Sequence, residues 1–390
     1  MSHCFDDILN RRGNGSMKWE DEYIQKRFHI TDTKDIYPLF IADMDFQMDE
    51  TVKEKMFSFL KDPDLGYFHV QDSFYESVVN WYSHIHHLTI EKDWIVPSIG
   101  TITTLNLLCD MLARNENIVI MPPVYGPFKT CSEVGHTISL PLIYTNGRYD
   151  IDYDGLIDIC SKQNIKVLML CHPHNPGGRM WSQDELQKLV DICKKYHVII
   201  LVDEIHGDLQ LTDEKFISMI EFADIYDQII VSSSPNKTFN ISALSTSFIL
   251  CCNPQLRQQY TDYLNHLHLG CNRMGVKMIE FVYNYGQDWY KELLQYIKQN
   301  MSMAITYLKQ ADMEVMVPDS GYLIWVRLPR IKDVDQFVLD LAKETHVLLE
   351  TGARFVSRYD GFVRINVATS RSLLEKAMKL FIDYYQKSSN

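Results

Sequence analysis

The sequence predicts an α/β fold: a large three-layer α/β/α domain around a mostly parallel sheet, with a smaller α+β domain. Three observations predict it. The chain has 390 residues, which is too long for one small core. In its middle, short apolar segments alternate with amphipathic ones, as strands and helices alternate in a parallel sheet. Near its end, two further strand-like segments flank and precede helical ones, which indicates a separate sheet.

The strands of the large domain are expected where apolar residues follow one another without alternation, because both faces of such strands are buried. These segments are residues 116–121, 164–170 and 198–202, and a similar run covers 228–231. A helix is expected to begin near Thr101. Another should follow Ser182, because Ser182 and Glu185 have the spacing of a capping box.

The smaller domain is expected to contain strands at 321–328 and 361–367 and a final helix at 373–385. The region 260–308 has few turn signals and suggests one extended helix. We therefore predict a large domain over residues 48–285 and a small domain formed by residues 1–47 and 286–390.

Composition excludes several classes of protein. A net charge of −13 and a pI near 5.5 argue against a general surface for nucleic acid or anionic membranes. Nine scattered cysteines without a C-x-x-C pair suggest reduced, buried thiols. The first residues have neither a basic nor an apolar segment, and no run approaches the ~20 apolar residues that span a bilayer. We therefore expect a cytoplasmic protein.

One lysine has an informative neighbourhood. Lys237 follows three serines, residues 232–234, at the end of a predicted strand. A lysine amine can form a Schiff base with pyridoxal 5′-phosphate (PLP), and nearby hydroxyls can hold its phosphate. A lysine after serines is more often an exposed loop charge, so the other strand ends decide its interpretation.

The ends of the other predicted strands carry polar groups that could bind PLP. Because the carboxyl ends of parallel strands meet at one crevice, these groups are expected to lie close together. Asp203 could pair with a pyridine nitrogen, although it could also simply cap a turn. Asn175 could donate to the ring oxygen of the cofactor, or be an ordinary turn residue. His206 could be a second donor, though a lone histidine is more often structural.

Two upstream segments could complete such a site. Gly100 and Thr101 lie at a predicted helix N-terminus, where backbone N–H groups bind anions. Tyr125 follows another strand and could stack on a flat ring, or pack in the core. A metal site is the weaker alternative, because no acidic or thiol set accompanies the histidines; its candidate ligands are His172, His174 and His206, or His84, His86 and His87.

The ordered set Asn175, Asp203 and Lys237 resembles fold-type I PLP enzymes of the aspartate aminotransferase superfamily, over nearly the whole chain. Finer motifs resemble its cystathionine β-lyase branch of the MalY and PatB type. They are Asn-Arg-Arg-Gly at 10–13, Ile-Ala-Asp-Met-Asp-Phe at 41–46, Pro-Val-Tyr-Gly-Pro-Phe at 123–128, Asp-Glu-Ile-His at 203–206 with Asp208, and Pro-Asn-Lys-Thr-Phe-Asn at 235–240. Most aminotransferases have tyrosine at the position of His206.

The resemblance implies a role for each candidate residue. Lys237 would be the catalytic Schiff-base lysine, Asp203 the partner of the pyridinium, and Tyr125 the stacking ring. Asn175 and His206 would contact the ring oxygen. The phosphate would be held by Gly100, Thr101, Ser232 and Ser234, and by Tyr67 of the neighbouring subunit, which implies a homodimer with shared sites. The substrate would be bound by Arg364, which grips its α-carboxylate, with Asn175 and Asp43.

The implied reaction is α,β-elimination on cystathionine or another S-substituted L-cysteine, giving pyruvate, ammonia and a thiol. The alternatives are an aminotransferase using the same residues and an inactive binding or regulatory protein. Four features depart from the common pattern of the superfamily and leave the substrate open. Gly177 stands where threonine is usual, Ala243 where glycine is common, and Ser245 where many aminotransferases carry a phosphate-binding arginine. The loop at 100–102 reads Gly-Thr-Ile rather than the commoner Gly-Val-Val.

Overall fold

The computed structural model describes residues 4–356 and 361–388. Its largest sheet has seven strands in the order β2-β10-β9-β8-β7-β3-β4, and only β10 is antiparallel to its neighbours. The predicted mostly parallel sheet is confirmed. The strands are β2 (Ile95–Ser98), β3 (Asn117–Ile120), β4 (His136–Ser139), β7 (Ile165–Cys171), β8 (Ile199–Asp203), β9 (Ile229–Ser233) and β10 (Ser247–Leu250).

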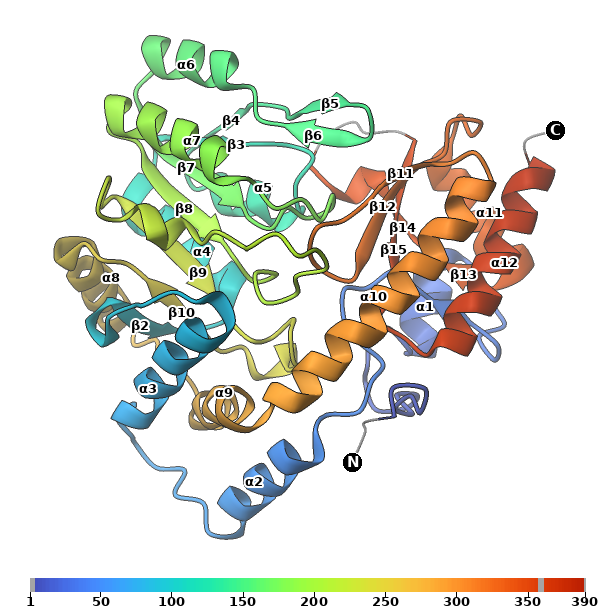
Figure 1. Ribbon diagram of the computed structural model, residues 1–390, viewed down its shortest axis with the longest axis horizontal. Helices are drawn as coiled ribbons and strands as arrows, with labels where there is room; N and C mark the ends of the chain where they lie inside the picture. The colour runs from blue at the N-terminus through green and yellow to red at the C-terminus, as the bar shows by residue number, and fades with distance from the viewer. Residues whose placement is uncertain (1–3, 357–360, 389–390) are drawn as a thin grey trace.

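Helices cover both faces of this sheet (Figure 1). Successive residues of β7 enter two different cores: Val167 and Met169 pack on the side of α4, and Leu168 and Leu170 on the side of α7. This alternation makes the domain three layers thick. The helices around the sheet are α3 (Asp72–Trp81), α4 (Thr101–Ala113), α5 (Pro127–Ser132), α6 (Tyr153–Lys162), α7 (Gln183–Tyr196) and α8 (Pro254–His266).

The predicted helix starts have local causes. Ser182 accepts a hydrogen bond from the backbone of Glu185, whose side chain accepts one from the backbone of Ser182, so the capping box that starts α7 is present. Gly100 precedes α4 with a φ of 60°, a conformation that favours glycine.

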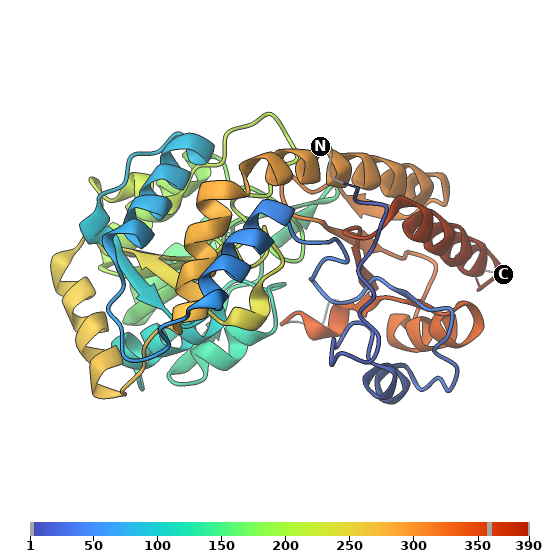
Figure 2. The ribbon, with the colours of Figure 1, turned by 90° about the horizontal axis from the view of Figure 1, so that it is seen from below.

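The second sheet is antiparallel, in the order β11-β12-β15-β14. The two sheets lie in separate lobes in Figure 2. The N-terminal segment joins the second lobe, because β1 pairs with β13. These elements are β1 (Tyr37–Pro38), β11 (Glu314–Met316), β12 (Leu323–Arg327), β13 (Val347–Leu348), β14 (Glu350–Thr351), β15 (Phe362–Asn366), α1 (Asp21–Phe28), α11 (Val334–Thr345) and α12 (Arg371–Ser388). The domain boundaries at 47/48 and 285/286 stay predictions.

The prediction of one extended helix over 260–308 is wrong. The chain instead forms α8, then α9 (Arg273–Tyr285) and α10 (Gln287–Gln310). Two local signals separate them: Asn272 caps α9 with its side chain, and Gly286 lies between α9 and α10. Only α10 is long, and it runs from the first lobe to the second (Figures 1 and 2).

The remaining elements lie at the periphery or form short turns. They are α2 (Glu50–Lys61), the hairpin β5 (Ile143–Thr145) and β6 (Arg148–Asp150), a π-helical turn (Tyr82–His86), and 3₁₀ turns at Lys92–Trp94, Met219–Phe222, Ser242–Leu244 and Gly352–Arg354. Within the described part of the chain, no helix combines the length and the apolar character needed to cross a membrane. The nine cysteines are free thiols; six are buried, whereas Cys4 is exposed and Cys252 and Cys271 are half-buried.

Candidate active site

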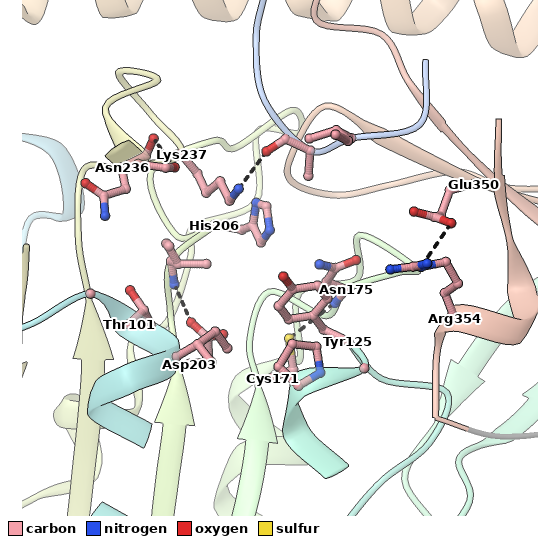
Figure 3. Close-up of a pocket in the computed structure, with 18 of the residues that line it drawn as sticks. Thr101, Tyr125, Cys171, Asn175, Asp203, His206, Asn236, Lys237, Glu350 and Arg354 are labelled. Carbon is pink, nitrogen blue, oxygen red and sulfur yellow. Dashed lines mark hydrogen bonds and ion pairs between the residues drawn. The ribbon is translucent and has the colours of Figure 1, made fainter. Parts of the chain in front are cut away.

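A cavity of about 730 Å³ lies at the carboxyl ends of β7, β8 and β9, between the two lobes. Its volume is in the range of small-molecule sites. Figure 3 shows side chains from both sheets converging on it. Eight of the predicted site residues line it: Gly100, Thr101, Tyr125, Asn175, Asp203, His206, Lys237 and Arg364.

Lys237 extends into the cavity from the loop after β9, and its Nζ donates a hydrogen bond of 2.6 Å to the carbonyl of Ala42. Burial is the main cause that lowers the pKa of Lys237 to about 8, with Arg364 acting in the same direction. The carboxylates of Asp43 and Asp203 oppose this shift. A substantial fraction of the amine is therefore neutral near physiological pH and can act as a nucleophile or base.

Asp203 is the last residue of β8 and is buried. Its Oδ1 accepts a hydrogen bond of 3.1 Å from the backbone of Ile205. Burial raises the pKa of Asp203 to about 6, although the charge of Lys237 opposes the rise. Such a carboxylate is mostly ionised at neutral pH and favours a cationic partner in the cavity.

His206 and Asn175 lie between Asp203 and the second lobe (Figure 3). Burial, followed by the charges of Lys237 and Arg364, lowers the pKa of His206 to about 3, so its imidazole is neutral. Its Nδ1 is buried and has no partner in the described residues. The Oδ1 of Asn175 accepts from Arg364 at 3.2 Å.

One end of the cavity is suited to an anion. Gly100 and Thr101 begin α4, whose N-terminal N–H groups and dipole favour negative charge. The Oγ1 of Thr101 is buried without a partner in the described chain. Ser242 also lines the cavity and was not predicted from the sequence. Ser245 was noted only as a departure from the family pattern, although it lines the cavity beside Gly100. Neither serine belongs to a recognisable local pattern.

Tyr125 and Arg364 complete the inner wall. The backbone N–H of Tyr125 donates to the carbonyl of Asn175, which fixes the tyrosine at the cavity. Arg364 lies in the middle of β15 and is buried, and burial lowers its pKa. Its Nη2 donates to the carbonyl of Phe40, whereas its Nε is buried without a partner among the described residues.

The segment 41–45 contributes Ile41 and Ala42 to the cavity wall and is hydrogen-bonded to the loop that carries Lys237, a contact that the sequence did not predict. Asn240 exchanges two hydrogen bonds with the backbone of Met44, and Asn366 donates to the carbonyls of Ile41 and Asp43. The hydroxyl of Tyr322 donates to the carbonyl of Ala42. This segment therefore connects Lys237 to the strand that carries Arg364.

Four predicted site residues are not among the cavity-lining residues. Ser232 is buried in β9, and Ser234 donates to the carbonyl of Thr246 at 2.8 Å. The carboxylate of Asp43 pairs with Arg11 at 2.5 Å. Tyr67 is fully exposed and lies away from this chain's own cavity, in the segment between α2 and α3. Direct ligand contacts by these residues stay predictions.

The departure at Gly177 has a structural explanation. A Cβ at Gly177 would lie 2.4 Å from the sulfur of Met316, so Met316 fills the space that a threonine side chain would need. Ser245 has a positive φ of 45° and is exposed at the cavity. Nothing in the structure explains Ala243, which is exposed.

The outer wall of the cavity carries charges that the sequence did not reveal. Arg27 Nη2 lies 2.5 Å from Oε1 of Glu350, and Arg354 Nε lies 3.5 Å from the same oxygen. All three residues line the cavity. They come from α1, β14 and the turn after β14, so they meet only in the folded protein.

The residues present fit PLP. Thr101 offers an unpartnered hydroxyl at a helix N-terminus, Asp203 a buried carboxylate, and Lys237 an amine with a lowered pKa. Figure 3 shows Thr101 and Asp203 on one side of the cavity and Lys237 above them. A phosphate, a pyridinium and an aldehyde are the three groups that these side chains suit. Among the described residues, no group of three or more His, Cys, Asp or Glu could hold a metal ion.

Comparison with known proteins identifies the family. The family model for aminotransferase class I and II matches residues 45–381. The chain belongs to this family.

Its relatives include both sequence and structural neighbours. Cystathionine beta-lyase PatB of Bacillus subtilis is 31% identical, over 96% of this chain and 98% of that protein. The PLP-bound C-S lyase from Staphylococcus hominis is 29% identical with a TM-score of 0.91, covering 99% of this chain and 98% of that one. A PLP-bound protein from Clostridium difficile 630 is 32% identical, with a TM-score of 0.91 and coverage of 98% and 100%. The fold-type I prediction and the PatB-type resemblance are confirmed.

Proposed function

We propose that this protein is a PLP-dependent carbon–sulfur β-lyase that cleaves cystathionine or other S-substituted L-cysteines to pyruvate, ammonia and a thiol. The observation that carries the proposal is the convergence of Lys237, Asp203 and Arg364 on one cavity. Similarity to PatB and to the Staphylococcus hominis C–S lyase supports the choice of reaction.

The inner cavity would hold the cofactor. Thr101 and the N-terminus of α4 would hold its phosphate, Asp203 would pair with its ring nitrogen, and Asn175 and His206 would donate to its ring oxygen; all of them line the cavity. Tyr125 would stack on its ring. When bound, PLP supplies an electron-withdrawing ring that stabilises negative charge at the substrate Cα. The ionised carboxylate of Asp203 keeps the ring nitrogen protonated.

Lys237 is the proposed general base that removes the Cα proton of the substrate. Once the substrate amine has replaced it, its free amine can take the Cα proton, and the low pKa from burial keeps a useful fraction of it unprotonated. The carbonyl of Ala42, 2.6 Å from Nζ in the structure, gives the free amine a hydrogen-bond acceptor at the cavity. Loss of the β-thiolate follows proton removal.

Arg364 orients the substrate. Its guanidinium is held by Asn175 and Phe40, and its unpartnered Nε is available to a carboxylate. A bidentate fork suits the α-carboxylate of an amino acid and fixes the direction of the Cα–H bond.

Aminotransferase activity is the second candidate, because the family model that matches the chain is named for it. A substrate panel separates the two: cystathionine, cystine and cysteine without keto acid, and alanine with keto acid. Pyruvate from cystathionine without keto acid supports the lyase. Reaction only in the presence of keto acid, with transfer of the amino group, supports the aminotransferase.

The protein is proposed to act as a cytoplasmic homodimer with shared sites. The region around α2 extends from the body of the chain (Figure 1) and exposes four large apolar side chains: Phe57, Leu60, Leu65 and Tyr67. Large apolar side chains exposed along one short segment, residues 57–67, favour a protein–protein contact there. A second copy would bring Tyr67 to the phosphate end of its partner's cavity.

Shared sites predict complementation between inactive variants. Lys237→Ala and Tyr67→Ala, each weakly active alone at limiting PLP, should recover about a quarter of wild-type activity after mixing and subunit exchange, since half of the dimers then hold one intact site of two. Pyruvate formation measures the recovery. A mixture of Lys237→Ala with Asp203→Asn is the control and should recover nothing, because both residues serve the same chain's site. Absence of recovery in the first mixture contradicts shared sites.

The lowered pKa of Lys237 predicts how cofactor capture depends on pH. Only the neutral amine attacks the aldehyde of PLP, so the capture rate of cofactor-free protein should rise with pH and level off above about 8. At pH 7.5 roughly a quarter of Lys237 would be neutral, against about one in a thousand for an ordinary lysine. Stopped-flow absorbance measures the rate, with Nα-acetyl-lysine as the control amine. A midpoint near 10 would contradict the burial of Lys237.

A further inference from the structure

The outer wall of the cavity has an excess of positive charge. Among the described residues that line the cavity, four are cationic and two are carboxylates, although the whole chain has a net charge of −13. Asp203 and Lys237 belong to the cofactor end, and Arg364 is assigned to the α-carboxylate. Arg27, Arg354 and Glu350 have no role in the proposed elimination at Cα and Cβ.

Arg27 and Arg354 share one carboxylate. Both approach Oε1 of Glu350, so the group of three keeps one net positive charge. Arg27 is fixed, because its guanidinium also lies 4.7 Å from the ring centre of Phe40 and 5.5 Å from that of Phe28. Its positive charge is largely balanced by Glu350.

Arg354 is the less constrained member. Its side chain is 61% exposed, and its ion pair with a described residue, a contact of 3.5 Å, is made through Nε. The two terminal nitrogens have no partner in residues 4–356 and 361–388. In Figure 3 the guanidinium points toward Asn175 and Tyr125, with Glu350 above it. A planar group whose two N–H₂ ends make no contact with the described residues, directed into a cavity, suits a carboxylate.

The position of Arg354 excludes the cofactor phosphate as its ligand. Thr101, at the phosphate end, and Arg354 lie on opposite sides of the cavity in Figure 3, with Asp203, His206 and Tyr125 between them. An anion at Arg354 would therefore come from the substrate. The α-carboxylate is assigned to Arg364, so the anion belongs to the other end of the molecule, on the thiol that leaves.

We propose that Arg354, supported by Arg27 and Glu350, binds a second carboxylate carried by the leaving thiol. This inference rests on the lyase function proposed above and narrows its substrates to S-substituted L-cysteines with an acidic group on the sulfur substituent. Because the group of Arg27, Arg354 and Glu350 is positively charged, the outer wall of the cavity disfavours sulfur substituents that end in a positive charge.

A matched series of substrates tests this site. S-(2-carboxyethyl)-, S-propyl- and S-(2-aminoethyl)-L-cysteine share the cysteine part and differ in the charge of the substituent. Wild-type kcat/KM should be at least about tenfold higher for the carboxyethyl than for the propyl compound, and lowest for the aminoethyl compound, as expected for one charge-assisted contact. In R354Q the carboxyethyl preference should be lost, and in R354E the aminoethyl compound should be preferred to the carboxyethyl one.

R330Q is the control variant, because Arg330 is an arginine of partial exposure that pairs with Asp312 and does not line the cavity. Its substrate preference should equal that of the wild type. The dissociation constant of each compound, from the rapid change in visible absorbance on mixing with the PLP-loaded protein and before pyruvate forms, gives the same comparison independently of elimination. A wild type without preference, or an R354Q with the full preference, overturns the second carboxylate site.

These measurements distinguish a failure of the proposed carboxylate site at Arg354 from a failure of the proposed lyase function. If all three compounds yield pyruvate at similar kcat/KM, the lyase function stands and the site at Arg354 is wrong. If none yields pyruvate but binding follows the predicted order, the site stands and the lyase function is wrong.

Discussion

Lys237→Ala is expected to lower the rate of pyruvate formation from cystathionine by roughly 10³-fold or more, because the variant loses both the nucleophilic amine and the general base. In the structure no other amine lines the cavity within the described residues. The rate should be measured at saturating PLP, so that weaker cofactor binding does not account for the loss. Single-turnover kinetics can then separate binding from proton removal.

Lys162→Ala is the matched control, since Lys162 is an exposed lysine of α6 that pairs with Asp158. Its activity should equal that of the wild type. Circular dichroism should show both variants folded. Full β-elimination activity in a folded Lys237→Ala protein would refute the catalytic assignment.

Asp203→Asn is expected to have the second-largest effect, with kcat lowered by roughly 10²-fold and PLP affinity lowered by at least about tenfold. The amide keeps the shape of the side chain but removes the charge that would hold the ring nitrogen protonated. Burial makes the loss costly, because solvent cannot replace the carboxylate. Steady-state kinetics and equilibrium dialysis of PLP measure the two effects.

The control for this variant is Asp184→Asn, an exposed aspartate in the first turn of α7. It should leave both quantities unchanged. If Asp203→Asn retained wild-type kcat and PLP affinity, the proposed pairing with the ring nitrogen would be wrong.

The sequence predicted the parts of the fold that depend on local pattern. Uninterrupted apolar runs located β3, β7, β8 and β9 within about two residues, and the capping box at Ser182 located α7. The interpretation of 260–308 failed, because the breaks depend on single residues, Asn272 and Gly286, within an otherwise helical pattern. Periodicity alone does not detect such interruptions.

The residues of the candidate site also fall into two groups, those that local sequence predicts and those that only tertiary packing brings together. Asp203 ends β8, and Asn175 and Lys237 follow β7 and β9, which are parallel to it, so the convergence of these residues was predictable from strand order. Arg27 lies 323 positions from Glu350 in the sequence, and although Arg354 follows Glu350 by four residues, no local motif marks either of them. The hydrogen bond from Lys237 to Ala42 likewise joins residues 195 positions apart. Such contacts follow from tertiary packing, which a single sequence does not reveal.

The most direct test of the proposed function is the product balance of the PLP-loaded protein with cystathionine in the absence of any keto acid. The lyase assignment predicts one pyruvate, one ammonia and one homocysteine for each cystathionine consumed, over many turnovers. Pyruvate can be measured with lactate dehydrogenase and the thiol with a disulfide reagent. Consumption that stops after about one equivalent per site and resumes only when a keto acid is added would contradict the lyase and indicate an aminotransferase.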